Sequence, residues 1–295
     1  MSVVEEIRKK WRPRKRTAHK GDFGQVFILA GSKGLAGAAH LAGMGAMRSG
    51  AGLVTVGVPG KIYSVIARRE EEIMVRPFSS TPAGALASRG LKSILPFAKT
   101  QDVLALGPGM SQNSDTQRLI RTLIQKAVLP FVIDADGLNA LKGHIGILRA
   151  CRGRAVLTPH PGEFVRLFGG KLSAGDAERR RRAREEATRH RVFIVLKGHH
   201  TVIAGPDGKV SVNRTGNPGM ATGGMGDVLT GIIASLIGQR FSLWDAARFG
   251  VLIHGVAGDL AAREVGEISL IAGDLLKYLP TAIRRMTSAK GKAYC

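Results

Sequence analysis

The feature that most constrains the fold is a series of short, nearly unbroken apolar runs separated by helical segments. These runs are QVFILAG, AGLVTVGVP, DVLALGPG, PFVIDAD, RAVLTPHPGE and VFIVLKG. A strand with one face in water alternates apolar and polar residues, whereas these runs are apolar almost throughout, so both faces are expected to be buried. Such strands joined by helices predict an α/β fold: a mainly parallel central sheet flanked by helices on both faces.

The pattern changes in the last third of the chain. Earlier, helices are expected at about 34–50, 85–99 and 116–127, and EEIMVRP is a further strand. HTVIAGPDGKVSVNRT then contains two short strands around a PDG turn, which is a hairpin signal. It is followed by a C-terminal helical part without strands, with segments at 225–238, 243–263 and 271–285.

The domain organisation follows from the absence of any linker or composition break after the first twenty or so residues. The chain has 295 residues, of which 44% are hydrophobic, so it can bury a substantial core. We expect one domain over residues 23–295. Residues 1–22 are expected to form a basic N-terminal arm or a poorly ordered first helix.

The formal net charge of +22 bears on the partners of the protein. The charge is concentrated near residues 8–16, 179–184 and 290–292. Such a field attracts anions, which makes nucleic-acid binding one hypothesis. Aromatic residues are only 5% of the chain and do not interleave with the basic runs, so the stacking platform of single-strand binders is missing. We therefore expect no specific nucleic-acid partner and interpret AGDAERRRRAREEATRHR as a helix with a solvated, mixed-charge face.

The cysteines and the N-terminal residues bear on location. Cys151 and Cys295 lie far apart and match no metal-ligand or redox spacing, which favours a reducing cytoplasm. MSVVEEIRKKWRPRKRTAHK lacks the apolar core of a signal peptide. The longest strongly apolar stretch, at 228–238, is far short of the ~20 residues that span a bilayer, so no membrane partner is expected.

Candidate site residues follow several strands at the point where each strand ends. They are Gly107–Gly109, Asp134 and Asp136, Thr158–Glu163, and Lys197–Gly198. Open parallel sheets bind ligands beyond the carboxyl ends of their strands, so these residues are expected to share one crevice. The phosphate loop GxxxxGK[ST] does not occur, and no GxGxxG joins a strand to a helix. The two usual nucleotide motifs are thereby excluded.

A glycine-rich stretch, NPGMATGGMGDVLTG, enters the apolar helix at 225–238. Gly223, Gly224, Met225 and Gly226 are expected to form an anion hole of backbone N–H groups at the helix start, with the glycines supplying positive φ angles. Such an arrangement suits phosphoryl transfer, in which preset donors stabilise the spread negative charge. Asp227 then has two interpretations: a base that takes the proton of an attacking hydroxyl, or a helix N-cap.

The other strand-end residues also allow more than one interpretation. In TPHPGEF, His160 is a ligand for a polar substrate or a structural histidine, and the Glu163 carboxylate is able to hold Mg²⁺ through water. Asp134 and Asp136 in IDADGLN are expected on one side of the strand end, for metal or phosphate chemistry, unless Asp136 caps a helix that starts at Gly137.

The segment KGHHT is the last of these candidates. Lys197 is able to meet a nucleotide phosphate as a point charge. The paired His199 and His200 indicate a metal only weakly, since no third ligand is near in sequence.

Taken together, these motifs resemble the ADP/ATP-dependent NAD(P)H-hydrate dehydratase family of the ribokinase-like superfamily. The resemblance extends from about Phe23 to Pro280 and rests on GLAGAAHLAGMGAMRSGAGLVTV, LGPGM, VIDADGLNAL, VLTPHPGEF, VLKGHHTVIAGPDG and GNPGMATGGMGDVLTG. It implies a ribokinase-like fold and a cofactor-repair reaction. The S form of NADHX or NADPHX is phosphorylated with ADP or ATP, with Mg²⁺, and loss of phosphate regenerates NADH or NADPH.

The resemblance also implies roles for individual residues. Asp227 matches the catalytic base and contacts the hydrate. Further hydrate contacts match Ala39, Gly109 and His160, and the nucleotide site matches Lys197, Gly198, His199, His200, Thr201 and Gly226. Asn217 shapes the entrance to the anion hole, Glu163 occupies the place of a Mg²⁺ carboxylate, and Asp134, Asp136 and Asn139 are supporting residues.

Three further expectations follow from the resemblance. Met225 stands where the family has a serine or threonine, which is harmless only if the anion hole works through backbone N–H groups. No epimerase segment precedes the motifs, so a separate NAD(P)HX epimerase is expected as a functional partner. A homo-oligomer, with a tetramer favoured, is expected as well.

Two other functions remain compatible with the residues. A small-molecule kinase of the same superfamily, of the hydroxymethylpyrimidine or hydroxyethylthiazole type, needs the same base and anion hole, although TPHPGEF and GNPGMATGG favour the dehydratase. The net charge keeps a nucleic-acid-binding protein as a more remote alternative.

Overall fold

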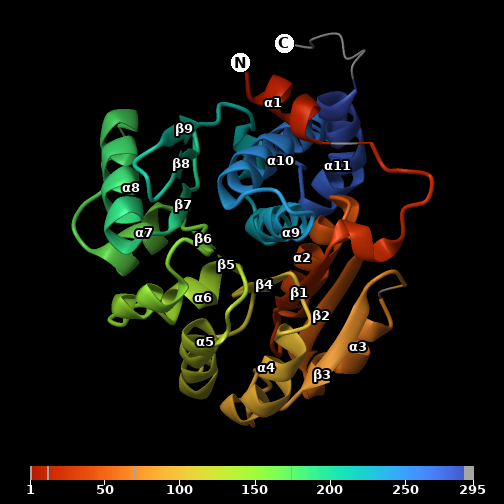
Figure 1. Cartoon of the computed structure of the whole chain (residues 1–295), viewed down its shortest axis with the longest axis vertical. Coiled ribbons are helices and arrows are strands. Elements are labelled where there is room, and N and C mark those ends of the chain that lie inside the picture. Colours follow the sequence, from red (N-terminus) through yellow and green to blue (C-terminus); the bar gives the residue numbers. More distant parts are fainter. Residues whose placement is uncertain (1, 12, 70, 174, 289–295) are drawn as a thin grey trace.

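The fold is built on a single nine-stranded sheet, seen in the computed structural model of Figure 1. The structure describes residues 2–11, 13–69, 71–173 and 175–288; Arg12, Lys290, Lys292 and Cys295 lie outside them. The strands are β1 Gln25–Leu29, β2 Leu53–Pro59, β3 Met74–Phe78, β4 Val103–Leu106, β5 Phe131–Ile133, β6 Ala155–Leu157, β7 Phe193–Leu196, β8 Val202–Ala204 and β9 Val210–Val212. Every apolar run that predicted a strand forms one.

The strand order is β3-β2-β1-β4-β5-β6-β7-β8-β9. Neighbours from β3 to β7 pair in parallel, while β7, β8 and β9 pair antiparallel. The mainly parallel sheet and the terminal hairpin are therefore confirmed. Because β1, β2 and β4 to β7 run in one direction, their carboxyl ends share one edge of the sheet, where the candidate residues were expected.

Helices cover both faces of the sheet. They are α1 Val3–Lys10, α2 Ala36–Arg48, α3 Tyr63–Ala67, α4 Leu91–Ala98, α5 Ser114–Lys126, α6 Ala135–Asn139, α7 Pro161–Phe168, α8 Asp176–His190, α9 Met225–Gly238, α10 Leu243–Val265 and α11 Ala272–Thr287. Alternate strand residues enter two separate cores: Ile28 joins the core of α2, α9, α10 and α11, and Leu29 joins that of α4, α5, α7 and α8. This alternation explains why the strands are apolar on both faces.

Two glycines allow α2 and α9 to pack closely. A β-carbon at Gly231 would lie 2.0 Å from the carbonyl oxygen of Ala42, and one at Gly45 would lie 2.5 Å from that of Val228. Real β-carbons do not approach atoms so closely, so only glycine fits at either position. This contact fixes the start of α9 relative to the sheet.

Two helical expectations need correction. The helix expected at 85–99 begins only at Leu91, because Leu86 forms an antiparallel bridge with Ser80 and a 3₁₀ turn, Ser88–Gly90, follows. Helix α7 was not predicted. It is short and starts at Pro161, whose fixed φ favours the first position of a helix.

The N-terminal residues contain a docked helix. Ile7 of α1 is fully buried. The Arg248 guanidinium of α10 donates to both carboxylate oxygens of Glu6, at 2.8 and 2.9 Å, and the Lys10 ammonium lies 2.7 Å from the Asp245 carboxylate. The expected boundary between residues 22 and 23 stays a prediction, while α1 contacts the core of α10 and α11 directly.

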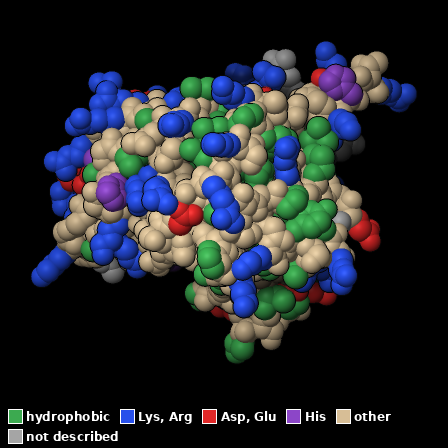
Figure 2. All heavy atoms as spheres, turned by 90° about the horizontal axis from the view of Figure 1, so that it is seen from below, with side chains coloured by type: hydrophobic (Ala, Val, Ile, Leu, Met, Phe, Trp, Pro, Cys, Tyr) green, Lys and Arg blue, Asp and Glu red, His purple; other side chains and the backbone are tan. Residues whose placement is uncertain are grey.

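The surface is rich in basic side chains. Figure 2 shows a face on which Lys and Arg are widely spread and acidic side chains are few. The expectation for the arginine-rich helix α8 was wrong in part: Arg179 is only 5% exposed and Arg182 donates to the carbonyl groups of Gly169 and Lys171, so both face inward. Among the described residues, no helix has the length and apolar character needed to cross a membrane.

Candidate active site

The first turn of α9 lies at the carboxyl edge of the sheet. The helix begins at Met225, after Gly224, whose φ of 91° is in the left-handed region. A β-carbon at Gly224 would also approach the Leu41 side chain to 2.5 Å, so this glycine is required. Gly223 and Gly226 do not have positive φ angles, contrary to expectation, because the single left-handed residue already makes the turn. The first N–H groups of the helix lack acceptors within it, and a helix end of this kind is suited to an anion.

Lys197 from the end of β7 reaches this first turn. A β-carbon at Gly226 would lie 3.2 Å from the Lys197 Nζ and 3.6 Å from an oxygen of Asp134. The glycine therefore leaves space for the ammonium group against the helix. A fixed cation and the positive end of a helix dipole thus converge on one place, which suits a phosphate.

Asp134 holds the Lys197 ammonium beside the first turn of α9. The Lys197 ammonium donates to one carboxylate oxygen at 2.7 Å, and the hydroxyl of Thr158 donates to the same oxygen at 2.8 Å. The hydroxyl of Thr230 on α9 donates to the other oxygen at 3.0 Å. Asp134 is 1% exposed, so this charge is buried but fully bonded.

The Asp136 carboxylate has other hydrogen-bond partners than the Asp134 carboxylate. Its carboxylate accepts hydrogen bonds from the backbone N–H of Ser111 at 2.8 Å and from the Asn139 amide at 3.0 Å; the Asn139 oxygen accepts from Arg166 at 2.6 Å. The chain turns at Ala135, whose φ is 43°, and enters α6, so Asp134 and Asp136 have different hydrogen-bond partners, although the charges of both raise the pKa of Asp227. The expected cap at Gly137 was wrong, since Asp134 is the N-cap residue of α6.

Asp227 is the third residue of α9 and is partly buried. The N-cap position belongs to Gly224, so the capping interpretation of Asp227 was wrong. Burial raises the pKa of Asp227 to about 7; the charges of Asp134 and Asp136 act in the same direction, and the Lys197 ammonium opposes them. A carboxylate with a pKa near neutrality is suited to take and return a proton at physiological pH.

Lys197 keeps its charge in this environment. Burial alone would lower its pKa, but the carboxylates of Asp134, Glu163 and Asp227 outweigh burial and raise it above the usual value. Its side chain is 20% exposed, so the ammonium is held firmly yet remains reachable. Lys197 is therefore a permanent cation beside Asp227.

His160 and Glu163 form the start of α7. The His160 Nδ1 accepts hydrogen bonds from the backbone N–H groups of Gly162 and Glu163. In return, the Glu163 carboxylate accepts a hydrogen bond from the backbone N–H of His160 at 2.8 Å, so the two residues form a capping box. Both residues thus have a structural role. Glu163 is 7% exposed and lies 3.9 Å from the Lys197 Nζ, whereas half of the His160 side chain is exposed.

Arg179 holds the segment from Lys197 to Thr201 in place. The guanidinium donates to the carbonyl groups of Leu196, Lys197 and His199. This buried contact was missed, because nothing in a run of arginines distinguishes the one that faces inward.

The side chains of the same segment are also ordered by local contacts. The ring centroids of His199 and His200 lie 3.8 Å apart, the His200 Nδ1 lies 2.7 Å from the Asp176 carboxylate, and the Thr201 hydroxyl donates to Gly198. No three His, Cys, Asp or Glu side chains in the described ranges form a set of ligands for one metal ion.

Two expected hydrate contacts lie beside the loops after β1 and β4. Gly109 has a φ of 60°, and a β-carbon there would lie 2.9 Å from the carbonyl oxygen of Leu35. The Ser32 hydroxyl donates to the Gly109 carbonyl at 2.8 Å, so the two loops are tied together. Ala39 is fully buried, and its side chain lies beneath Gly31. Contact between Ala39 and a ligand therefore requires movement of the loop after β1.

The loop that contains Asn217 is fixed by an aspartate of α10. The Asn217 amide and the N–H of Gly216 each donate to the Asp259 carboxylate at 3.0 Å, and the Asn217 oxygen accepts from Gly219. Asp259 was missed, because its partner lies 42 residues away with no local pattern that connects the two.

Met225 has its side chain in the core, where it is 4% exposed. Its carbonyl lies 2.9 Å from the His254 Nε2, which must donate because a carbonyl only accepts. Burial lowers the pKa of His254 to about 4, so this histidine is neutral at physiological pH. The sequence did not indicate His254, which supports the first turn of α9 from beneath.

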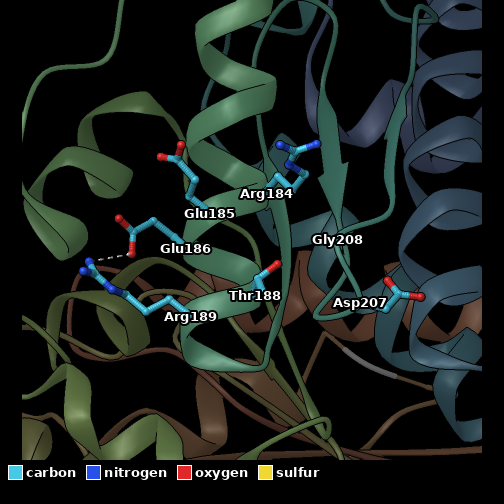
Figure 3. A pocket seen from close by; sticks show the side chains of 7 residues that line it. All are labelled: Arg184, Glu185, Glu186, Thr188, Arg189, Asp207 and Gly208. Carbon is cyan, nitrogen blue, oxygen red and sulfur yellow. Dashed lines mark ion pairs between the residues drawn. The ribbon is translucent and has the colours of Figure 1, made fainter.

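A hollow of about 740 Å³ elsewhere on the surface does not contain the candidate residues. It lies between the second half of α8 and the turn between β8 and β9, and is lined by Arg184, Glu185, Glu186, Thr188, Arg189, Asp207 and Gly208. Figure 3 shows side chains of both charge signs around it and an ion pair between Arg189 and Glu186. It lacks the converging strand ends and the helix N-terminus of the site around Asp227.

The fold and the site together define a protein of the ribokinase-like class, and the comparisons agree. Residues 26–281 match the family model described as NAD(P)H-hydrate dehydratase. The chain belongs to this family. It is similar to the bifunctional NAD(P)H-hydrate repair enzyme Nnr of Moorella thermoacetica, with 45% identity over 92% of this chain and 52% of the relative. The chain thus spans about half the length of that curated relative.

Two solved structures are also similar. The ADP/ATP-dependent NAD(P)H-hydrate dehydratase of Bacillus subtilis, co-crystallised with ATP and Mg²⁺, has a TM-score of 0.78 and 32% identity, over 96% of this chain and 97% of that one. A ribokinase-like superfamily protein of Enterococcus faecalis has a TM-score of 0.81 and 26% identity, over 97% of this chain and 95% of that one. The family resemblance and the fold inferred from the motifs are confirmed.

Proposed function

We propose that the chain catalyses the ADP- or ATP-dependent dehydration of (6S)-NADHX and (6S)-NADPHX to NADH and NADPH. The observation that carries this proposal is the placement of Asp227, with a pKa of about 7, beside the Lys197 ammonium at the start of α9. A proton acceptor and an anion-binding site as neighbours suit the transfer of a phosphoryl group to a hydroxyl. Membership of the NAD(P)H-hydrate dehydratase family supports the hydrate as the source of that hydroxyl.

In the reaction, Asp227 takes the proton of the hydrate hydroxyl while the hydroxyl oxygen bonds to the terminal phosphoryl group of the nucleotide. The bond between that group and the rest of the nucleotide breaks, which yields AMP from ADP. The N–H groups of the first turn and Lys197 stabilise the transferring charge. The ring nitrogen next to the phosphorylated carbon then expels phosphate, because phosphate leaves far more readily than hydroxide, and loss of a proton from the neighbouring ring carbon restores the double bond of NADH or NADPH.

The remaining predicted roles belong to the same proposal. The segment Lys197–Thr201 and Gly226 bind the nucleotide, and Asn217 shapes the entrance. Gly109 and His160 contact the hydrate, as does Ala39 once the loop after β1 has moved. The hydrogen bonds of Arg179 to this segment support a nucleotide loop with a fixed backbone. The exposed half of His160 leaves its ring able to contact a ligand while it caps α7.

A magnesium ion fits this site if the nucleotide phosphates and water supply most of its ligands. The Glu163 carboxylate lies 3.9 Å from the Lys197 Nζ and accepts a hydrogen bond from the backbone N–H of His160, and no cluster of three His, Cys, Asp or Glu side chains exists among the described residues. Mg²⁺ is commonly bound through substrate phosphates, one carboxylate and water. We therefore propose that Glu163 would hold Mg²⁺ through water, and that the bound ion would neutralise charge on the nucleotide phosphates.

Partners and location are also proposals. The relative from Moorella thermoacetica is named bifunctional, and the chain matches about half of it, which supports an NAD(P)HX epimerase as a functional partner. We further propose a cytoplasmic homo-oligomer, with a tetramer as the favoured state, without a membrane or specific nucleic-acid partner. Equilibrium sedimentation measures the oligomeric state directly.

The decisive experiment is recovery of the reduced-nicotinamide absorbance from purified S hydrate with ADP and ATP in parallel, each with Mg²⁺. We expect recovery with at least one nucleotide, and formation of AMP in the ADP reaction. Asp227→Asn should lower kcat by about 10²-fold or more while the protein stays folded. Failure with both nucleotides would overturn the proposal, and a stable phosphorylated product would instead indicate a small-molecule kinase.

A further inference from the structure

Asp134 connects four elements at one point. It follows β5, its ammonium partner Lys197 follows β7, and its hydroxyl partner Thr230 belongs to α9. Thr158, at the end of β6, donates to the same carboxylate at 2.8 Å. A buried carboxylate that receives three hydrogen bonds from three different elements has little freedom to move, and it fixes the groups bonded to it.

We propose that Asp134 is a positioning residue for phosphoryl transfer: it holds the Lys197 ammonium against Gly226, where one cation serves both the transferring phosphoryl group and Asp227. The proposal rests on the proposed function and deepens it. Asp134 itself is buried beneath Lys197 and does not take part in bond making. The lack of a side chain at Gly226 gives the ammonium its place, and Asp134 keeps the ammonium there.

The charges around Lys197 show why an anchor is needed. Lys197 faces Asp134 at 2.7 Å, Glu163 at 3.9 Å and the Asp227 carboxylate, and the neutral His254 lies on the far side of the α9 turn. Asp227 faces Asp134, Asp136 and Lys197. Without the negative charge of Asp134, the ammonium would move toward Asp227 and pair with it. That pairing would occupy the base and withdraw the cation from the phosphate.

The test compares Asp134→Asn with Asp245→Asn in the full chain. Asp245 is a matched control, because it is also buried, also 2.7 Å from a lysine ammonium and also bonded to a hydroxyl, but it belongs to the contact between α1 and α10. Two properties are measured: the affinity for ADP by calorimetry, and the protonation of Asp227 by ¹³C NMR of its carboxyl group as a function of pH.

For Asp134→Asn we expect the pH of half-protonation of Asp227 to fall by about one unit, since a negative charge is removed and the ammonium moves closer. The ADP affinity is expected to fall about tenfold. In Asp245→Asn both quantities should equal those of the wild type. In steady-state assays with the hydrate, the low-pH limb of kcat should move toward acid by the same amount as the NMR midpoint.

An unchanged Asp227 midpoint in a folded Asp134→Asn protein would overturn the proposal, and so would equal effects in both variants. If Asp134→Asn fails to fold, Thr230→Val removes one donor to Asp134 and keeps its shape; we expect a two- to threefold loss of ADP affinity, of the order of one neutral hydrogen bond, and no loss would overturn the proposal. Because NMR and calorimetry need no turnover, a wild-type protein without dehydratase activity would refute the proposed function alone.

Discussion

The Lys197 ammonium lies against Gly226: its nitrogen is 3.2 Å from the point where a β-carbon of residue 226 would be, so a side chain there would crowd the ammonium. Lys197 comes from a strand end and Gly226 from the first turn of a helix, 29 residues later in the chain. The absence of one side chain is therefore part of the geometry of the proposed phosphate site. Glycine within a helix lowers its stability, so this position favours function over stability.

We therefore expect Gly226→Ala to make the protein more stable and less active. The alanine should raise the free energy of unfolding by up to about 1 kcal/mol through helix propensity, and the new methyl group should displace the Lys197 ammonium. The ammonium must give way by a few tenths of an ångström, so we expect kcat/KM to fall by roughly 10-fold or less. Urea unfolding and the hydrate assay measure the two effects.

Gly146→Ala serves as the control for Gly226→Ala. Gly146 is exposed and has no atom within 4 Å of its would-be β-carbon, so activity should be retained there. Full activity of Gly226→Ala would contradict the role assigned to the vacant space.

Asp227→Asn should make the protein more stable at alkaline pH. The folded-state pKa of about 7 lies above the unfolded value of 3.8, so the folded protein binds the proton more tightly. The wild type consequently loses stability as the pH rises from about 4 to about 7, whereas the Asn variant does not. We expect the variant to have the higher Tm at pH 8 and the difference to shrink at pH 5. A constant difference in Tm between these pH values would show that Asp227 titrates normally.

Met225→Ser, which introduces the hydroxyl residue usual in the family, should destabilise the protein without raising turnover. The Met225 side chain is 4% exposed and packs in the core, so the substitution leaves a cavity. The expected loss is about 2–5 kcal/mol, as for other large-to-small core substitutions. Thermal or urea unfolding measures this loss. A marked gain in kcat would instead mean that residue 225 reaches the phosphate through its side chain.

Arg179→Lys should weaken nucleotide binding, although the charge is kept. The planar guanidinium reaches three carbonyl groups of the segment after β7, and a lysine ammonium does not reproduce that fork. We expect the ADP affinity to fall about tenfold, measured by calorimetry. Arg180→Lys, on the exposed face of the same helix, is the matched control and should bind ADP as the wild type does. Equal affinities in all three proteins would exclude a role for Arg179.

Much of the fold and the centre of the site could be predicted from local patterns. The bounds of α9 followed from a glycine-rich turn before an apolar run, and the convergence of Asp134 and Lys197 followed from their positions at strand ends. The separate hydrogen-bond partners of Asp136 could not be predicted, because the regular alternation of strand residues ends where Ala135 turns the chain into α6.

Residues that act through tertiary contact alone were not predictable. Arg179 lies in a run of arginines whose other members face water or other loops, and burial of one of them depends on where the end of β7 lies relative to α8. His254 and Asp259 both lie on α10 and support loops far away in the chain. A histidine or aspartate in a helix has no neighbouring signal for such a role.

Helix α1 has a consequence for how the protein is shortened or extended. Its residues precede the range 26–281 that the family model matches, yet Glu6 accepts two hydrogen bonds from Arg248, whose side chain is only 11% exposed, and Ile7 is fully buried. A recombinant fragment cut at residue 26 would therefore lose these two hydrogen bonds, leave Arg248 with Asp245, at 3.9 Å, as its carboxylate partner, and expose the apolar residues of α10 and α11 that α1 covers. The packed part of this chain thus extends beyond the residues that the family model matches.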